Sequence, residues 1–205
     1  MNAPTTTSGN PFSTRRVRPG AIAYLFPPGE NAASMVARLS KQAWRGQIVG
    51  PHGSGKSTLL KSLLDEIRLA GRQPMVITLR DGAHRLPPGS VNFDRINAST
   101  LLIIDGYEQL HWWNRWRIAR ACRRRGCGLL VTAHQCVGFP RLMTVNADLQ
   151  VAQRIVADLL RHVTCRITQH DVAEAFNRSR GNVRETLFDL YDLYERQRMC
   201  DMGRP

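Results

Sequence analysis

The sequence has little that would assign it to a metal-bound, disulfide-linked or membrane class. Its five cysteines form no C-x-x-C pair and no cluster with histidines at the spacing of zinc ligands. An odd, scattered set of this kind is typical of free thiols in a reducing compartment, so we expect a cytoplasmic protein. No apolar run approaches the length of a membrane span. The pair Arg15-Arg16 ahead of an apolar stretch resembles an export signal, but that stretch is short and stops at Pro27-Pro28.

Lysine is also scarce. Only Lys41, Lys56 and Lys61 occur among the 29 basic residues, and the others are arginines. The formal net charge is +13, and residues 1–150 hold 20 of the basic but only 8 of the 16 acidic side chains. A basic excess suggests an anionic partner such as nucleic acid, and it bears on association rather than on fold.

The composition, with 42% apolar and 22% charged residues in a chain of 205, is that of an ordinary globular protein. Five apolar runs have the length of buried strands: Gln47–Val49, Met75–Leu79, Leu101–Ile104, Leu129–Thr132 and, more weakly, Leu142–Val145. Helical patterns lie beside or between them, at 31–43, 56–69 and 108–124. Strands that alternate with helices predict a three-layer α/β domain with a parallel sheet. The stretch 81–100 is the least regular and is either a loop or a degenerate helix.

Beyond about residue 150 the strand patterns stop, and three helices are expected. The first covers 147–162. Thr168, with Asp171 three residues on, is expected to cap the second, which runs to Gly181, and Asn182 with Glu185 caps the third. These patterns predict a flexible N-terminal segment over 1–20, an α/β core over 21–148 and a small all-helical lid over 149–200.

The strongest motif is G-P-H-G-S-G-K-S over 50–57, which fits the P-loop pattern G-x-x-x-x-G-K-[ST]. It follows a predicted strand and opens a predicted helix, so its backbone N–H groups and the helix dipole would converge on phosphate oxygens. Lys56 would reach the β- and γ-phosphates of ATP, and the Ser57 hydroxyl would bind Mg²⁺. The expected nucleotide-binding residues are Gly50, Pro51, His52, Gly53, Ser54, Gly55, Lys56, Ser57 and Thr58.

The run Leu101–Ile104 ends in Asp105, as a Walker B strand does when it delivers a carboxylate to the Mg²⁺ beside Ser57. Many related ATPases place a water-polarising glutamate directly after this aspartate. Here that position is Gly106, and the next acid is Glu108. Glu108 either faces the γ-phosphate or is an acid at a helix start that the helix dipole stabilises. Hydrolysis is therefore less firmly predicted than ATP binding.

Three further residues are candidates for phosphate contacts. Thr132 ends the next apolar strand, where strand ends line the ligand crevice of a parallel sheet, although a β-branched residue also suits a strand. His134 is a second choice there. Arg184 lies in the first turn of the last helix, where a cation opposes the dipole, so it either contacts an anion or is simply solvated.

These motifs together resemble the AAA+ ATPase superfamily: the P-loop, the LLIID and LLVT strands, and the helical G-N-V-R-E segment at 181–185. The Asp105–Glu108 segment, D-G-Y-E, resembles the Walker B of STAND/NACHT ATPases. The segments at Asn10–Phe12 and Tyr24–Phe26 are similar to the start of ExeA/TniB-like ATPases, where this region helps to enclose the adenine.

The resemblance implies that nucleotide is held between a core and a lid, with Arg184 as sensor 2, Thr132 as sensor 1 and hydrolysis coupled to lid movement or subunit assembly. Two departures matter. Gly106 replaces the usual glutamate, and the segment between the last two strands is short. An arginine finger normally comes from that segment, and Arg141 is the nearest candidate here. The absence of an arginine finger would argue against a ring-shaped oligomer. The sequence therefore does not decide whether the chain assembles in ATP.

The predicted helix after Glu108 is unusually rich in tryptophan and arginine. It carries three tryptophans at 112, 113 and 116 and no acid. Interleaved cations and aromatics suit nucleic-acid binding. A protein-docking face is a second interpretation, and a third is a structural helix whose tryptophans pack on the sheet. The arginines concerned are Arg115, Arg117, Arg120, Arg123, Arg124 and Arg125.

The sequence thus predicts an Mg-ATP-binding P-loop ATPase with Lys56, Asp105, Glu108, Thr132 and Arg184 as catalytic residues. Its expected role is to switch or assemble a macromolecular complex, with DNA or a DNA-bound protein as the partner. One alternative is a signalling or scaffold module that hydrolyses ATP weakly or not at all. A small-molecule kinase is less favoured, because such kinases insert an arginine-bearing lid within the α/β core.

Overall fold

The apolar runs of the sequence form the strands of a single parallel sheet in a computed structural model of the chain, which describes residues 9–79 and 82–202. The five strands are β1 (Arg45–Val49), β2 (Gln73–Thr78), β3 (Thr100–Asp105), β4 (Gly128–Ala133) and β5 (Arg141–Thr144). Their order is β2-β3-β4-β1-β5, and every neighbouring pair is parallel. The predicted fold class is confirmed, and each predicted strand is present.

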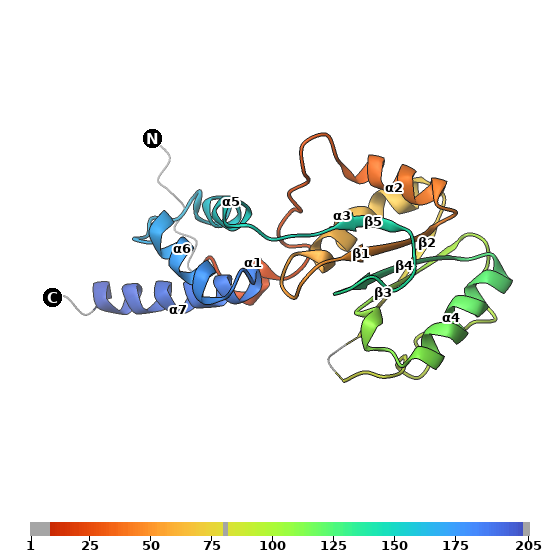
Figure 1. Ribbon diagram of the computed structural model, residues 1–205. Coiled ribbons are helices and arrows are strands. Elements are labelled where there is room, and N and C mark those ends of the chain that lie inside the picture. The colour runs from red at the N-terminus through yellow and green to blue at the C-terminus, as the bar shows by residue number, and fades with distance from the viewer. Residues whose placement is uncertain (1–8, 80–81, 203–205) are drawn as a thin grey trace. The chain divides into compact units, whose positions relative to one another are not determined.

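The helices of the α/β region lie on both faces of this sheet. Figure 1 shows α2 (Ala32–Lys41) and α3 (Lys56–Leu69) on one face and α4 (Trp112–Arg125) on the other. β3 and β4 are almost wholly buried between these layers, as their unbroken apolar sequence requires. The sheet therefore delivers the carboxyl ends of its central strands to one common edge.

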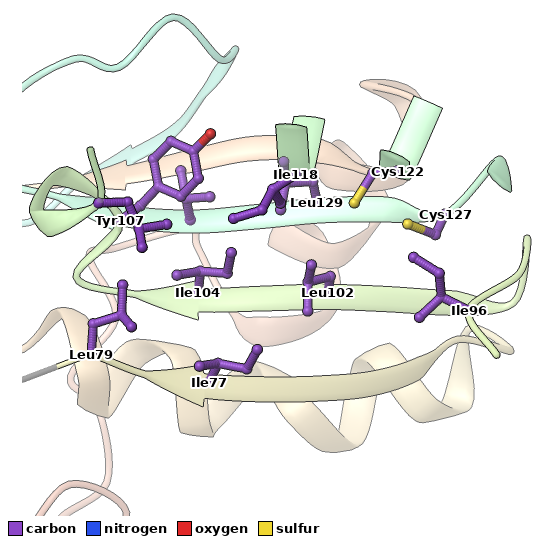
Figure 2. Packing of buried hydrophobic residues seen from close by; sticks show 12 residues of the cluster. Ile77, Leu79, Ile96, Leu102, Ile104, Tyr107, Ile118, Cys122, Cys127 and Leu129 are labelled. Atoms are coloured by element: carbon purple, nitrogen blue, oxygen red, sulfur yellow. The ribbon is translucent and has the colours of Figure 1, made fainter. Parts of the chain in front are cut away.

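Alternation along β3 divides the core between the two layers. Leu102 and Ile104 point toward α4, where Ile118 and Cys122 pack on them, as Figure 2 shows. Leu101 and Ile103 are equally buried and face the opposite side, toward α2 and α3. Packing on both faces fixes the position of the strand end at Asp105.

The C-terminal helices are α5 (Leu149–Leu160), α6 (Gln169–Arg178) and α7 (Val183–Met202). Thr168 and Asp171 form the predicted capping box of α6, with both reciprocal hydrogen bonds present. Asn182 Oδ1 accepts a hydrogen bond from the Glu185 N–H at 3.2 Å, so Asn182 caps α7 as predicted. The three helices enclose their own apolar cluster, which includes Val156, Val172, Leu187 and Leu190.

The described part of the N-terminal segment packs with these helices. Phe12 is fully buried in their cluster, and Asn10 donates hydrogen bonds to the Tyr191 carbonyl at 3.1 Å and to Glu195 at 2.7 Å. A short helix, α1 (Thr14–Val17), follows. One buried aromatic ring and one amide thus anchor Asn10 and Phe12, and the flexible segment expected over 1–20 stays a prediction. Residues 1–8 lie outside the described residues.

The chain divides into two compact units. Unit 1 holds the described residues up to Leu25, the P-loop residues Pro51–Gly55 and the chain from Asn146 onward. Unit 2 holds Phe26–Gly50 and Lys56–Val145, and so includes the whole sheet. The expected boundaries of core and lid, at 21–148 and 149–200, stay a prediction.

The segment after β3 differs in one respect from the sequence prediction. The expected helix over 108–124 is split into a short 3₁₀ helix, η1 (Tyr107–Gln109), and α4. Leu110 has an extended backbone between them, and the His111 side chain caps α4 by accepting from the Trp113 N–H at 3.4 Å. In the irregular stretch 81–100, residues 82–99 contain no helix or strand. No helix in the described ranges has both the length and the apolar character needed to cross a membrane.

Candidate nucleotide-binding site

Asp105 is the centre of a hydrogen-bond network at the carboxyl edge of the sheet. Its Oδ2 accepts from the Ser57 hydroxyl at 2.6 Å, and its Oδ1 accepts from the Thr132 hydroxyl at 2.5 Å. The Thr132 oxygen in turn accepts from the Gly106 N–H at 2.9 Å. Three elements meet here: the first turn of α3, the end of β3 and the end of β4. The network leaves hard oxygen atoms of Ser57 and Asp105 side by side, which is the ligand type that Mg²⁺ prefers.

Thr132 has a more specific place than its sequence position alone indicates. The side chain is fully buried, and its single hydroxyl hydrogen is directed to Asp105. Thr132 therefore positions the Asp105 carboxylate. The predicted contact between Thr132 and the γ-phosphate stays a prediction.

Lys56 opens α3 and is buried against the loop that precedes it. Its Nζ donates to the Gly50 carbonyl at 2.6 Å. Burial lowers the pKa of Lys56, and the carboxylates of Glu108 and Asp105 oppose this effect by raising the pKa. The side chain is thus a desolvated cation facing two acids, and a phosphate group would relieve its burial cost.

The remaining P-loop residues, in unit 1, carry the marks of a phosphate-binding backbone. Gly53 and Gly55 have φ angles of +67° and +101°, which favour glycine. A Cβ at Gly53 would lie 1.7 Å from the Asn182 Oδ1, so any larger residue there would displace the loop or the Asn182 side chain that caps α7. The Ser54 hydroxyl is buried and has no hydrogen-bond partner among the described residues. Buried polar groups are nearly always hydrogen-bonded, so this orphan hydroxyl fits a loop that binds an anionic ligand.

Glu108 is held close to Lys56 by two neighbours. Its Oε1 lies 3.1 Å from the Nδ1 of His134, the residue two places after Thr132. Its backbone carbonyl accepts from the guanidinium of Arg115, which also donates to the Leu110 carbonyl at 2.6 Å. The other oxygen, Oε2, is buried and has no hydrogen-bond partner among the described residues. Glu108 lies in the first turn of η1, and its Oε2 could orient a water molecule.

Three further candidate residues are exposed: Arg184, Arg141 and His52. Arg184, in the first turn of α7, places its guanidinium carbon 5.7 Å from the centre of the Phe188 ring. Arg141 is exposed at the start of the edge strand β5, and His52 is exposed in the P-loop. The predicted roles of Arg184 as sensor 2, of Arg141 as an arginine finger and of His52 in nucleotide binding stay predictions.

Sequence reasoning missed three contacts at the site: Asn182 against Gly53, His134 against Glu108, and Arg115 beneath the Glu108 carbonyl. The sequence indicates Asn182 only as a helix cap, and Arg115 only as a cation for a partner. In each contact the sequence around the residues already explains their presence in another way. The sequence therefore contains no signal that would have indicated the contact. A separate group on α6, His170, Asp171 and Glu174, brings possible metal-ligand atoms within 4.8 Å of one another, but Asp171 is already used in the capping box.

Comparison with solved structures shows the fold plainly. The replication initiator DnaA bound to AMPPCP and single-stranded DNA matches with a TM-score of 0.55 and 16% identity, covering 84% of this chain and 63% of that one. A Walker-type ATPase of Pyrococcus abyssi matches with a TM-score of 0.54 and 10% identity, covering 80% and 66%. A RuvB variant of Thermotoga maritima matches with a TM-score of 0.52 and 15% identity, covering 75% and 57%.

These neighbours are AAA+ P-loop ATPases, and the chain has the fold that its motifs led us to expect. It spans less than two thirds of the length of each of them. No family sequence model matches the chain, and no curated protein matches it in sequence. The resemblance to the ExeA/TniB-like and STAND/NACHT groups stays a prediction.

Proposed function

We propose that this chain binds Mg-ATP and hydrolyses it to ADP and phosphate. The observation that carries the proposal is the pairing of Ser57 with Asp105, which joins the P-loop helix to the end of β3 through a 2.6 Å hydrogen bond. The buried Lys56 beside them and the orphan hydroxyl of Ser54 support the same ligand.

The role that we propose for each residue follows from the chemistry of its side chain or backbone. The backbone of Gly50–Thr58 binds the phosphates, and Lys56 neutralises their charge. Ser57 and Asp105 would hold Mg²⁺, which would withdraw charge from the phosphate oxygens. Thr132 keeps the Asp105 carboxylate turned toward Ser57.

Glu108 accepts a proton from the attacking water in this proposal. His134 fixes one oxygen of Glu108 and leaves Oε2 for the water, while Arg115 fixes its backbone. Geometry of this kind, with one oxygen anchored and the other available, suits a general base. Arg184 contacts the phosphates as sensor 2, and Arg141 reaches the nucleotide of a neighbouring copy when the chain assembles in ATP.

The biological role that we propose is an ATP-driven switch or assembly factor for a macromolecular complex, with DNA or a DNA-bound protein as the partner. The structural neighbour DnaA, solved with single-stranded DNA bound, supports a partner of this class. The uneven net charge of +13 does so as well.

A second candidate function is a nucleotide-binding signalling or scaffold module with little turnover. Gly106, in place of the usual glutamate, favours it, because Glu108 must then act from η1. A small-molecule kinase is disfavoured, since α5, α6 and α7 follow the sheet in sequence and are not inserted within it.

A calorimetric titration with ATP tests the binding half of the proposal. Lys56→Ala should abolish detectable binding, whereas Lys61→Ala, an exposed lysine on the same helix, should bind like the parent. Equal affinities for the parent and Lys56→Ala would refute the P-loop assignment. Phosphate release by the parent then separates an ATPase from a binding module.

A further inference from the structure

Helix α4 exposes its three tryptophans. Trp112, Trp113 and Trp116 have 65%, 48% and 45% of their surface accessible. The sheet is contacted instead by the buried Ile118 and Cys122. The interpretation in which the tryptophans pack on the sheet is therefore wrong, and these rings need another explanation.

The three indoles form a continuous aromatic surface. Trp113 and Trp116 are stacked, with ring centres 4.9 Å apart and planes 20° from parallel. Trp112 lies edge-on to Trp113 at 5.5 Å. The array begins at the amino end of α4, and Trp112, the most exposed ring, lies at its edge.

Four arginines continue the same face of the helix. Spacings of three and four residues place Trp113, Trp116, Arg117, Arg120 and Arg124 along one stripe. Trp112 and Arg123 flank it. We call these seven residues the Trp–Arg face.

The other two arginines of α4 are used within unit 2. Arg115 donates to the backbone carbonyls of Glu108 and Leu110. Arg125 pairs with Asp94 at 2.7 Å. The sequence prediction included both arginines as partner contacts, and that part of it stays a prediction; the Trp–Arg face leaves them out because they already have partners within the unit.

Few contacts outside the Trp–Arg face explain its side chains. α4 has no acidic residue, and none of the described residues forms an ion pair with Arg117, Arg123 or Arg124. Like charges three and four residues apart weaken a helix, and clustered exposed rings commonly mark an interaction site. The Arg120 guanidinium carbon lies 5.4 Å from the centre of the Trp116 ring, which gives this arginine a contact inside the face. The helix dipole accounts for cations in the last turn, but not for Arg117 or the exposure of the indoles.

We propose that the Trp–Arg face binds single-stranded nucleic acid. Each nucleotide supplies one flat base for stacking and one phosphate for an arginine, and this face offers both kinds of group in alternation. The bases of a duplex are stacked on one another, so a duplex would bind the arginines through its phosphates but would offer no free base to the indole rings. An acidic peptide would likewise satisfy the charges without matching three adjacent ring surfaces. The proposal refines the partner of the proposed function and relies on it only for the biological setting.

Fluorescence anisotropy with a labelled thymidine oligonucleotide of about 20 nucleotides tests the proposal, because this probe forms no duplex. The parent should bind it at low salt, and more tightly than a duplex of equal length. A uridine oligonucleotide in a parallel arm decides between DNA and RNA. Quenching of tryptophan fluorescence should accompany binding, since Trp44, the fourth tryptophan, is buried elsewhere.

Two pairs of variants separate stacking from charge. Trp112→Ala with Trp116→Ala should weaken binding by about 10-fold or more, and the same positions changed to Phe should retain most of it. Reversal of Arg117, Arg120 and Arg124 to Glu should weaken binding and flatten its salt dependence.

The matched charge control is reversal of three exposed arginines elsewhere, Arg95, Arg154 and Arg198, which changes the net charge equally and should leave most of the binding. Circular dichroism melts verify that the variants fold. Three outcomes would overturn the proposal: no binding by the parent at low salt, equal binding of duplex with no effect of the tryptophan changes, or equal competition by poly-glutamate. ATP titration is independent of all three, so each failure leaves the ATP-binding proposal standing.

Discussion

The hydroxyl of Ser57 lies 2.6 Å from Oδ2 of Asp105, although the two residues are 48 positions apart in the sequence. One is in the first turn of α3 and the other ends β3. The second carboxylate oxygen accepts from Thr132 at the end of β4. A single carboxylate thus joins the P-loop helix to two central strands.

Thr132→Val tests whether Thr132 positions the Asp105 carboxylate or only fills space in the core. The change keeps the shape of a fully buried side chain but removes the donor to Asp105 and the acceptor for the Gly106 N–H. We expect a loss of about 1–3 kcal/mol in the free energy of unfolding and a clear fall in phosphate release. Thr78→Val, at the exposed end of β2, is the matched control and should alter neither. Parent-like turnover in Thr132→Val would contradict the positioning role.

Glu108→Gln should leave ATP bound with little hydrolysis. The amide keeps the size of the side chain but cannot take a proton, and general bases contribute about 10²–10⁴-fold to rates. Phosphate release should fall by at least about 100-fold, while ATP affinity is kept. His134→Ala should lower turnover less, because it loosens Glu108 without removing it.

The control for the Glu108 change is Glu174→Gln, an exposed acid on α6 that should behave like the parent. Single-turnover measurements locate the defect in the chemical step. Unchanged turnover in Glu108→Gln would show that another group activates the water, and it would favour the weakly hydrolysing module.

Gly53→Ala should weaken ATP binding, because the P-loop or the Asn182 side chain must move to admit the new Cβ. The new Cβ would lie 1.7 Å from Asn182 Oδ1, at a backbone φ of +67°. Gly71→Ala is a sharp control, since Gly71 has a φ of +78° but nothing within 4 Å of the new Cβ. Gly71→Ala introduces the backbone strain of about 1–2 kcal/mol but no steric clash, so this variant should bind ATP normally. If both variants lose ATP binding equally, the contact with Asn182 is not the cause.

Lys56→Met should raise the thermal stability of the protein at pH 7 while removing ATP binding. Burial lowers the pKa of Lys56, so the folded state holds this proton less readily than the unfolded state. The stability cost is therefore complete below the lowered pKa and disappears as the pH rises toward the ordinary value of 10.5. Melting curves across this range should show the gap between variant and parent closing. A gap that widens with pH would contradict the assignment.

Much of the architecture could be predicted from the sequence because the signals are local. Unbroken apolar runs such as Leu101–Ile104 can be satisfied only in a sheet buried on both faces, and the P-loop fixes its own strand-to-helix context. Thr168 and Asn182 predicted helix starts through their own cap chemistry.

The contacts that build the site were harder to predict, because they join distant positions. Nothing in the neighbourhood of Asn182 indicates Gly53, and nothing near His134 indicates Glu108. The interpretation that the tryptophans of α4 pack on the sheet was wrong for a different reason. Indoles at helical spacing usually pack inward, and here three of them face outward, a departure from the pattern that points to function rather than to folding.

The most direct test of the central claim is phosphate release from ATP by the parent and by Asp105→Asn over a series of Mg²⁺ concentrations. The asparagine keeps the size of the side chain but lacks the second carboxylate oxygen and the charge that holds Mg²⁺. Phosphate release should rise with Mg²⁺ in the parent and should be about 100-fold lower in the variant at every Mg²⁺ concentration. Release that is independent of Mg²⁺, or equal in the two proteins, would contradict that claim.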